Sequence, residues 1–314
     1  MRILLLVVGL AVLAIVLHAM GVGTILAVAR QSGWTIVWMI ALYGVHIVVR
    51  GWVIWRSLPP SRLGLVETLR IRFAAEAVEM LTFTGPFLAE PAKGWMFIRR
   101  GIPAAQTAAV ILFEYLTYTV VAAGMALAGL IVLLSRGAFS GRVHGAIVAL
   151  VWGLAVFIAG VVWAAITGVG LLTPAVRLVR PLLGAERAEA VAGRVGRMET
   201  HLLSILHASP AHFLEALLAQ IAGHGLLAIE IWLLLRALGY HVRAADPLIV
   251  EGGVKFINAV FVFIPGQFGA AEGTNALIVE SLGFPAAVGV TLSLMRRVRA
   301  YLVASVGLLV APPR

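Results

Sequence analysis

Residues 263–273 read FIPGQFGAAEG, a stretch that interrupts an otherwise apolar region of the chain. Pro265, Gly266 and Gly269 precede the carboxylate of Glu272 within it. Proline lacks a backbone donor and glycine adopts backbone angles that other residues avoid, so these residues predict a break in a helix. In a membrane, irregular backbone is tolerated only where it is buried in protein or lines a cavity. The stretch therefore predicts a broken helix beside a polar cavity.

The composition around this stretch predicts a membrane protein. The 314 residues are 61% hydrophobic and 12% charged, with a mean hydropathy of +1.03, whereas soluble globular proteins carry about 25% charged residues. We expect an all-α fold, a polytopic transmembrane helical bundle forming a single transmembrane domain over residues 1–314. A spanning helix needs roughly 20 apolar residues. Runs of about this length or longer cover residues 3–20, 34–55, 104–134, 145–173, 213–235 and 285–310.

The first run also has the features of a signal peptide, with Ala27, Val28 and Ala29 as a cleavage site. Its charged region consists of Arg2 alone, and several further spans follow it. We therefore expect an uncleaved first helix.

The placement of arginines predicts the topology. Arginines cluster within residues 56–72, 99–100 and 177–197, and the loops between these clusters hold fewer. Because cytoplasmic loops are enriched in Lys and Arg, we assign the clusters and both termini to the cytoplasmic face of the membrane. This assignment explains the net charge of +10, so we expect no nucleic acid partner.

Two segments do not fit a simple series of crossings. Residues 66–98 begin and end beside cytoplasmic arginines and are interrupted at Gly85-Pro86, which predicts a re-entrant hairpin. Residues 247–282 contain the opening stretch and predict a second hairpin that enters from the external face. Between the hairpins, residues 177–208 mix arginines and glutamates with apolar residues at helical spacing, which predicts a cytoplasmic amphipathic segment.

The two predicted hairpins also match each other in sequence. Glu90 lies 182 residues before Glu272, and at the same offset GIPAA (residues 101–105) aligns with GFPAA (residues 283–287). We interpret the match as a degenerate inverted repeat. In transporters, broken helices at corresponding positions of such repeats indicate a binding site near the membrane midplane.

Glu90 and Glu272 are the main candidates for substrate binding or gating, because ionisable residues in membrane segments are costly and usually functional. The chain has two lysines, Lys93 three residues after Glu90 and Lys255 four after Glu251. Both spacings place the charges on one helix face. Each pair is either a self-neutralising ion pair or a site for a headgroup phosphate, and the sequence leaves both readings open.

Glu114, Arg296 and Arg297 complete the set of candidates. Glu114 aligns with Arg296 at the 182-residue offset, which predicts a buried pair between them. We favour a structural role for this pair over contact with a substrate.

Enzyme motifs are missing from the sequence. It has no His-Glu-x-x-His zinc motif, no Gly-x-Ser-x-Gly, no P-loop and no Gly-x-Gly-x-x-Gly. It also has no cysteine, which excludes thiolate chemistry and Cys-ligated metals. We expect no enzyme activity, no cofactor and no metal.

The sequences GPFLAEPAKGWMFIRRGIP (residues 85–103) and IPGQFGAAEGTNALIVESLGFP (residues 264–285) resemble the lysylphosphatidylglycerol synthase transmembrane-region family of flippase-like membrane proteins. The resemblance covers nearly the whole chain and assigns the family's conserved carboxylates to Glu90, Glu114 and Glu272. The synthase domain of the bifunctional relatives is absent from this sequence. The departures from the family pattern are Ala89 for glycine, Lys93 for the commoner arginine, and Tyr115 and Tyr118 for an arginine and an aspartate.

The resemblance implies that a lipid headgroup crosses between the leaflets of a bacterial inner membrane through a cavity where the two hairpins meet. The expected partners are a membrane lipid, the bilayer, and either a second copy of the chain or a lipid-synthesising enzyme. Two alternatives remain open: an ion-coupled carrier of a small soluble metabolite, whose cavity would be closed to lipid, and a non-transporting partner of a lipid-modifying enzyme, which would tolerate loss of both Glu90 and Glu272.

Overall fold

The computed structural model describes residues 33–59, 63–82, 85–135, 141–170, 172–178, 184–260 and 269–312. Within these ranges all regular structure is helical. The predicted first helix and the Pro265-Gly266 break lie outside the described residues. The helices are α3 (Thr35–Ser57), α4 (Leu65–Leu81), α5 (Pro86–Ile98), α6 (Ala104–Ser135), α7 (Gly141–Thr167), α8 (Leu172–Leu178), α10 (Ala185–Ala208), α11 (Pro210–Ala237), α12 (Asp246–Val260), α13 (Ala270–Ser281) and α14 (Ala286–Val310).

Four of the described helices are long and apolar enough to cross a membrane: α3, α6, α11 and residues 144–167 of α7. They confirm a membrane protein with several spans. Helix α7 ends at Thr167, earlier than the apolar run predicts, where Gly168 turns the chain with a φ of +71°. Helix α14 has 25 residues, but three arginines near its centre set it apart from the four apolar spans.

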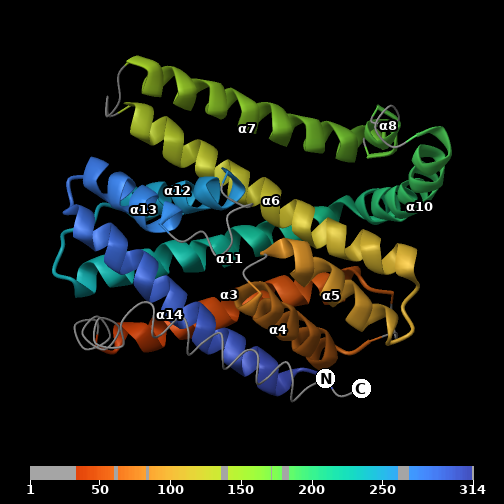
Figure 1. Cartoon of the computed structure of the whole chain (residues 1–314), viewed down its shortest axis with the longest axis horizontal. Coiled ribbons are helices and arrows are strands. Elements are labelled where there is room, and N and C mark those ends of the chain that lie inside the picture. Colours follow the sequence, from red (N-terminus) through yellow and green to blue (C-terminus); the bar gives the residue numbers. More distant parts are fainter. Residues whose placement is uncertain are drawn as a thin grey trace.

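Two pairs of short helices lie toward opposite ends of the bundle. Helices α4 and α5 pack together, as do α12 and α13. Figure 1 shows the α12–α13 pair at one end and the α4–α5 pair toward the other, with α6 and α11 running between them. Each pair also packs on a long helix from the other half of the chain, α4 on α14 and α12 on α6.

Glycine permits the two backbones to approach closely where α4 packs on α14 and where α12 packs on α6. A Cβ atom on Gly307 of α14 would lie 2.2 Å from the carbonyl oxygen of Phe73 in α4. A Cβ atom on Gly252 of α12 would lie 2.7 Å from the carbonyl oxygen of Met125 in α6. Small residues at helix interfaces let backbones approach closely in membranes, so these two glycines set the distance between the short helices and their partners.

Apolar clusters flank a polar centre. One cluster includes Met39 of α3 and Ile231 of α11, and others include Ile54 and Val53 of α3 and Ala216 of α11. The buried polar residues of α3 and α11 lie between these positions in each helix. The polar side chains are therefore held at mid-helix depth rather than at the ends of the bundle.

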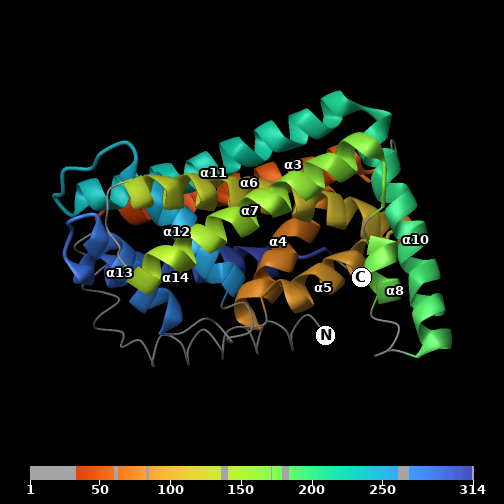
Figure 2. The ribbon, with the colours of Figure 1, turned by 90° about the horizontal axis from the view of Figure 1, so that it is seen from above.

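Helix α10 forms most of the predicted amphipathic segment at residues 177–208. Figure 2 shows it running across the end of the bundle, at an angle to the long helices. It buries Ala192, Leu202 and Leu206, and its buried Glu199 carboxylate accepts hydrogen bonds from the backbone of Leu172 at 2.6 Å and Thr173 at 3.1 Å. These bonds attach α8 to α10.

Candidate functional site

The polar centre of the bundle consists of two groups of ion pairs. We call them the first cluster, from α3, α4, α5 and α6, and the second cluster, from α11, α12 and α14. The first cluster contains Arg50, Arg72, Glu76, Glu90, Lys93 and Glu114. The second cluster contains Glu230, Glu251, Lys255, Arg296 and Arg299.

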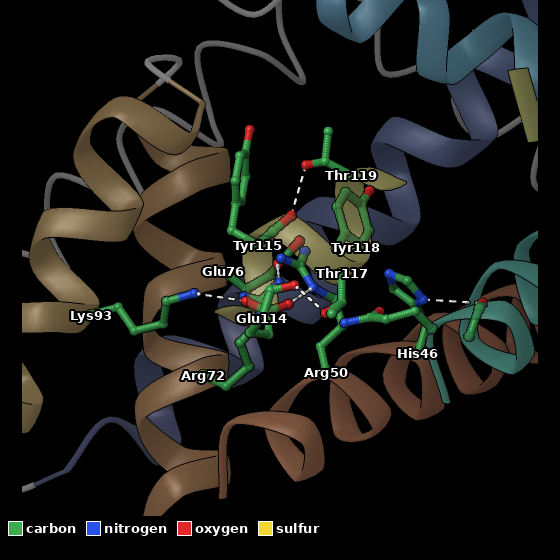
Figure 3. A network of polar contacts seen from close by, with 12 residues as sticks. His46, Arg50, Arg72, Glu76, Lys93, Glu114, Tyr115, Thr117, Tyr118 and Thr119 are labelled. Atoms are coloured by element: carbon green, nitrogen blue, oxygen red, sulfur yellow. Dashed lines mark hydrogen bonds and ion pairs between the residues drawn. The ribbon is translucent and has the colours of Figure 1, made fainter. Parts of the chain in front are cut away.

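Glu114 lies at the centre of the first cluster. Its fully buried carboxylate accepts a hydrogen bond from Arg50 Nε at 2.6 Å and another from Lys93 Nζ at 3.3 Å. Lys93 is also fully buried, and its ammonium lies 2.7 Å from Glu90 Oε2, one turn earlier in α5. Figure 3 shows the Lys93 and Arg50 side chains converging on Glu114 from separate helices. One lysine thus connects a deeply buried carboxylate to a more accessible one.

A further pair in α4 extends the first cluster. Arg72 Nη2 lies 2.9 Å from Glu76 Oε2, at the i,i+4 spacing, and both side chains are buried. The hydroxyl of Tyr43 donates a hydrogen bond to the other oxygen of Glu76. This bond connects α4 to α3.

Arg296 lies at the centre of the second cluster. Its guanidinium is 2.6 Å from Glu251 and 3.6 Å from Glu230. Glu251 also pairs with Lys255 at 3.0 Å, and Glu230 pairs with Arg299 at 2.7 Å. The second cluster therefore centres on a guanidinium between two carboxylates, whereas the first centres on a carboxylate between two cations.

Two tyrosines join the clusters into one network. Lys255 donates a hydrogen bond to the Tyr118 hydroxyl at 3.0 Å, and the Arg50 guanidinium lies 4.1 Å from the centre of the Tyr118 ring. Similarly, the Arg299 guanidinium lies 3.7 Å from the centre of the Tyr43 ring. We call the two clusters with Tyr43 and Tyr118 the central network.

Glu90 and Glu272 lie at more accessible positions than the buried glutamates. Their side chains are 21% and 27% exposed. Glu272 pairs with Arg297 of α14 at 2.8 Å and accepts a hydrogen bond from the backbone N–H of Gly269 at 2.8 Å. The second bond caps α13 at its first turn, so this carboxylate has a structural role as well as a charge partner.

The sequence predicted some of these contacts correctly. The pairs Glu90–Lys93 and Glu251–Lys255 both form. Gly85 precedes α5, which begins at Pro86, and Gly269 precedes α13; their φ angles of +57° and +79° are in the region that favours glycine.

One prediction was wrong. Glu114 pairs with Arg50 and Lys93, whereas Arg296 pairs with Glu251 and Glu230. The predicted Glu114–Arg296 pair is therefore not formed, because each residue finds its partners within its own half of the chain.

Arg72, which the sequence analysis groups with the cytoplasmic arginines, differs from its neighbour Arg70 in burial. Its side chain is 2% exposed and paired with Glu76, while the Arg70 side chain is 49% exposed. Successive helix positions turn by about 100°, so arginines two apart face nearly opposite sides of α4.

The candidates from the sequence do not include four residues of the central network that hold its ion pairs and ring contacts: Tyr43, Arg50, Glu230 and Arg299. The i,i+4 spacing of Arg72 and Glu76 is a signal for a pair on one helix face. The contacts of Tyr43 and Arg299 join distant helices, and no local spacing indicates them. In the part of the chain that the structure describes, no group of three or more His, Asp or Glu side chains could hold a metal ion.

Comparisons with known proteins bear on the whole chain. Residues 2–307 match the family described as "Lysylphosphatidylglycerol synthase TM region". No curated protein and no solved structure matches the chain.

Proposed function

The chain belongs to the lysylphosphatidylglycerol synthase TM region family, and from this membership we propose that it moves a polar-headgroup lipid between the two leaflets of a bacterial inner membrane. The proposed activity is translocation, by flipping or scrambling, and involves no covalent step.

The observation that carries the proposal is the central network. A lipid headgroup must cross the hydrocarbon layer, where an unpaired charge is expensive. The network offers charged groups of both signs at mid-helix depth, and each of its central charges already shares two partners. A headgroup phosphate can replace a carboxylate as the partner of Lys93 or Arg296, so charges are exchanged rather than exposed to lipid.

The accessible carboxylates complete this scheme. Glu90 and Glu272 are the more exposed partners of Lys93 and Arg297, so they are the first groups that a headgroup cation can reach. The N-terminal ends of α5 and α13 carry partial positive charge and favour a nearby phosphate. We assign Glu90 and Glu272 to headgroup binding or gating. We assign Lys93, Lys255 and Arg296, which are more buried, to contact with the headgroup after it has entered.

We further infer that α4–α5 and α12–α13 are re-entrant hairpins of an inverted repeat. Helices α6 and α14 begin at Ala104 and Ala286, the 182-residue offset that the sequence match gives. Packing between the halves is also reciprocal. Helix α4 of the first half packs on α14 of the second, and α12 of the second half packs on α6 of the first. Both facts support two halves related by a pseudo-two-fold axis, with the hairpins entering from opposite faces and both termini in the cytoplasm.

Leaflet exchange in liposomes tests the proposal. Purified protein is reconstituted with fluorescent anionic, zwitterionic or aminoacylated lipids, and an impermeant quencher reports the fraction in the outer leaflet. We expect the wild type to speed exchange of at least one lipid class and Glu90→Gln and Glu272→Gln to slow it at least tenfold. Glu280→Gln is the matched control, because Glu280 is exposed on the same helix as Glu272.

Two results would count against the proposal. Exchange no faster than in empty liposomes would favour a carrier of a soluble metabolite. Equal rates in the wild type and in both glutamine variants would remove the two carboxylates from the mechanism.

A further inference from the structure

Gln220 and His224 of α11 are buried polar residues that the central network does not use. Both side chains have no exposed surface. The two amide atoms of Gln220 and the Nε2 atom of His224 have no hydrogen-bond partner. Such atoms are rare in folded proteins, because a buried polar group without a partner costs free energy comparable to a lost hydrogen bond. A bound molecule would supply the hydrogen-bond partners that these three atoms lack.

The backbone fixes the protonation of the His224 ring. Its Nδ1 atom lies 2.8 Å from the carbonyl oxygen of Gln220, so Nδ1 carries a hydrogen and donates to that carbonyl. A neutral ring then presents a lone pair at Nε2. A charged ring would present a second N–H without an acceptor, so the neutral form is the one that fits this structure.

The His224 ring lies between α11, α3 and α6. Gln220 is one turn earlier in α11, so its side chain projects from the same face of that helix. The His224 ring centre lies 4.7 Å from that of Tyr118 and 5.8 Å from that of His46. His46 is bonded through Nδ1 to the carbonyl oxygen of Gly223 at 3.1 Å, and Figure 3 shows it one turn from Arg50 in α3.

The nearest charges belong to the central network. Arg50 of α3 and Lys255 of α12 are the cations, and both contact Tyr118, the ring closest to the imidazole. Glu251 of α12 is the carboxylate on this side and is paired with Lys255 and Arg296.

The other two helices packed against α11 lie farther from the imidazole. The α14 arginines reach α11 at Glu230, more than one turn beyond His224. Helix α10 joins α11 at Ser209, roughly four turns before it. Two cations, Arg50 and Lys255, therefore lie near the imidazole, and among the described residues their ion pairs are with network carboxylates. An added positive charge on the ring is unfavourable in this setting.

We propose that Gln220 and His224 hold an internal water molecule and that His224 takes up a proton when an anionic headgroup binds the central network. The inference rests on the proposed function. A water molecule supplies the donor that Nε2 lacks and the partners that the amide lacks, as buried waters do in polar cavities. A headgroup phosphate that pairs with Lys255 or Arg50 offsets their charge. The ring can then accept a proton from bulk solvent that the internal water relays, so the water gains a proton as it gives one up.

The consequence is reciprocal binding. If the anion favours the proton, the proton favours the anion by the same factor. The protein would then couple headgroup movement to proton movement, with His224 as the group that carries the proton.

Nuclear magnetic resonance of histidine nitrogens tests both the internal water and the proton uptake without measuring transport. Protein labelled with 15N-histidine is placed in lipid nanodiscs, and His224→Gln assigns the signal. We expect a neutral ring with Nδ1–H and a magnetisation-transfer peak from water, which Gln220→Leu removes. Addition of glycerol phosphate, a soluble headgroup, should raise the proton-binding constant of His224 by at least about fivefold, the low end for coupled sites.

The outcomes separate this inference from the proposed function. A ring without a water peak in the wild type overturns the site, and a proton-binding constant of His224 that glycerol phosphate leaves unchanged overturns the coupling. Because both signals come from the wild type, a folding defect in Gln220→Leu does not prevent a decision. Failure of lipid exchange in liposomes, with the water peak and the proton uptake both present, would refute the lipid function alone.

Discussion

Glu114→Gln is the substitution that tests the central network most directly. The carboxylate is fully buried between Arg50 at 2.6 Å and Lys93 at 3.3 Å. Glutamine keeps the shape and one acceptor oxygen but removes the negative charge. Lys93 retains Glu90 at 2.7 Å, so the loss falls mainly on Arg50, which keeps the Tyr118 ring.

The magnitude follows from this geometry. Breaking a buried ion pair by removing one partner costs about 3–5 kcal/mol, because the other charge stays buried and uncompensated. We expect Glu114→Gln to lower the free energy of unfolding by about 3 kcal/mol, since the amide still accepts one hydrogen bond. Glu90→Gln should cost about 1 kcal/mol or less, because that side chain is partly exposed and surface pairs contribute about 0–1 kcal/mol.

Unfolding in mixed micelles with increasing SDS, followed by tryptophan fluorescence, measures both values. The double variant Arg50→Gln/Glu114→Gln supplies the control, because it removes both charges together. It should be less destabilised than the sum of the two single variants. The reasoning would be refuted if Glu114→Gln unfolded with the same free energy as the wild type, or if the double variant were simply additive.

Three other predictions use the same unfolding assay. Gly307→Ala should destabilise by more than about 1 kcal/mol, because the new Cβ would meet the Phe73 carbonyl at 2.2 Å; Gly124→Ala, with open space around it, should be neutral or stabilising, and equal effects would contradict the close-packing argument. Tyr118→Phe should cost about 1 kcal/mol through the lost acceptor for Lys255, and no change would mean that the hydroxyl does not join the two clusters. Glu199→Gln should free α8 from α10 and speed proteolysis within residues 172–178, because its carboxylate accepts from two backbone N–H groups there; unchanged cleavage would contradict this role.

The sequence predicted those parts of the fold that depend on local spacing. Apolar runs predicted α3, α6 and α11, and the i,i+4 spacing predicted the Glu251–Lys255 pair. The prediction of a Glu114–Arg296 pair was wrong for a geometric reason. A repeat offset identifies equivalent positions, and equivalent positions touch only if they lie on the axis that relates the halves.

The rest of the site depends on how distant helices pack. Tyr43 meets Glu76 across 33 residues and Arg50 meets Glu114 across 64. Neither distance leaves a local pattern, because the contacts exist only once α3, α4 and α6 are assembled. By contrast, helical periodicity could have predicted that Arg72 is buried while Arg70 is exposed.

Under the proposed repeat, Glu114 and Arg296 are matched positions that carry opposite charges. These positions lie 182 residues apart in the sequence, yet one places an anion between two cations and the other places a cation between two anions. Under the proposed function, a zwitterion would therefore have one favoured orientation across the two clusters, because reversing it would bring like charges together. Two halves with the same charges would have no such preference, so under the same proposal this one difference would give a symmetrical passage a polarity.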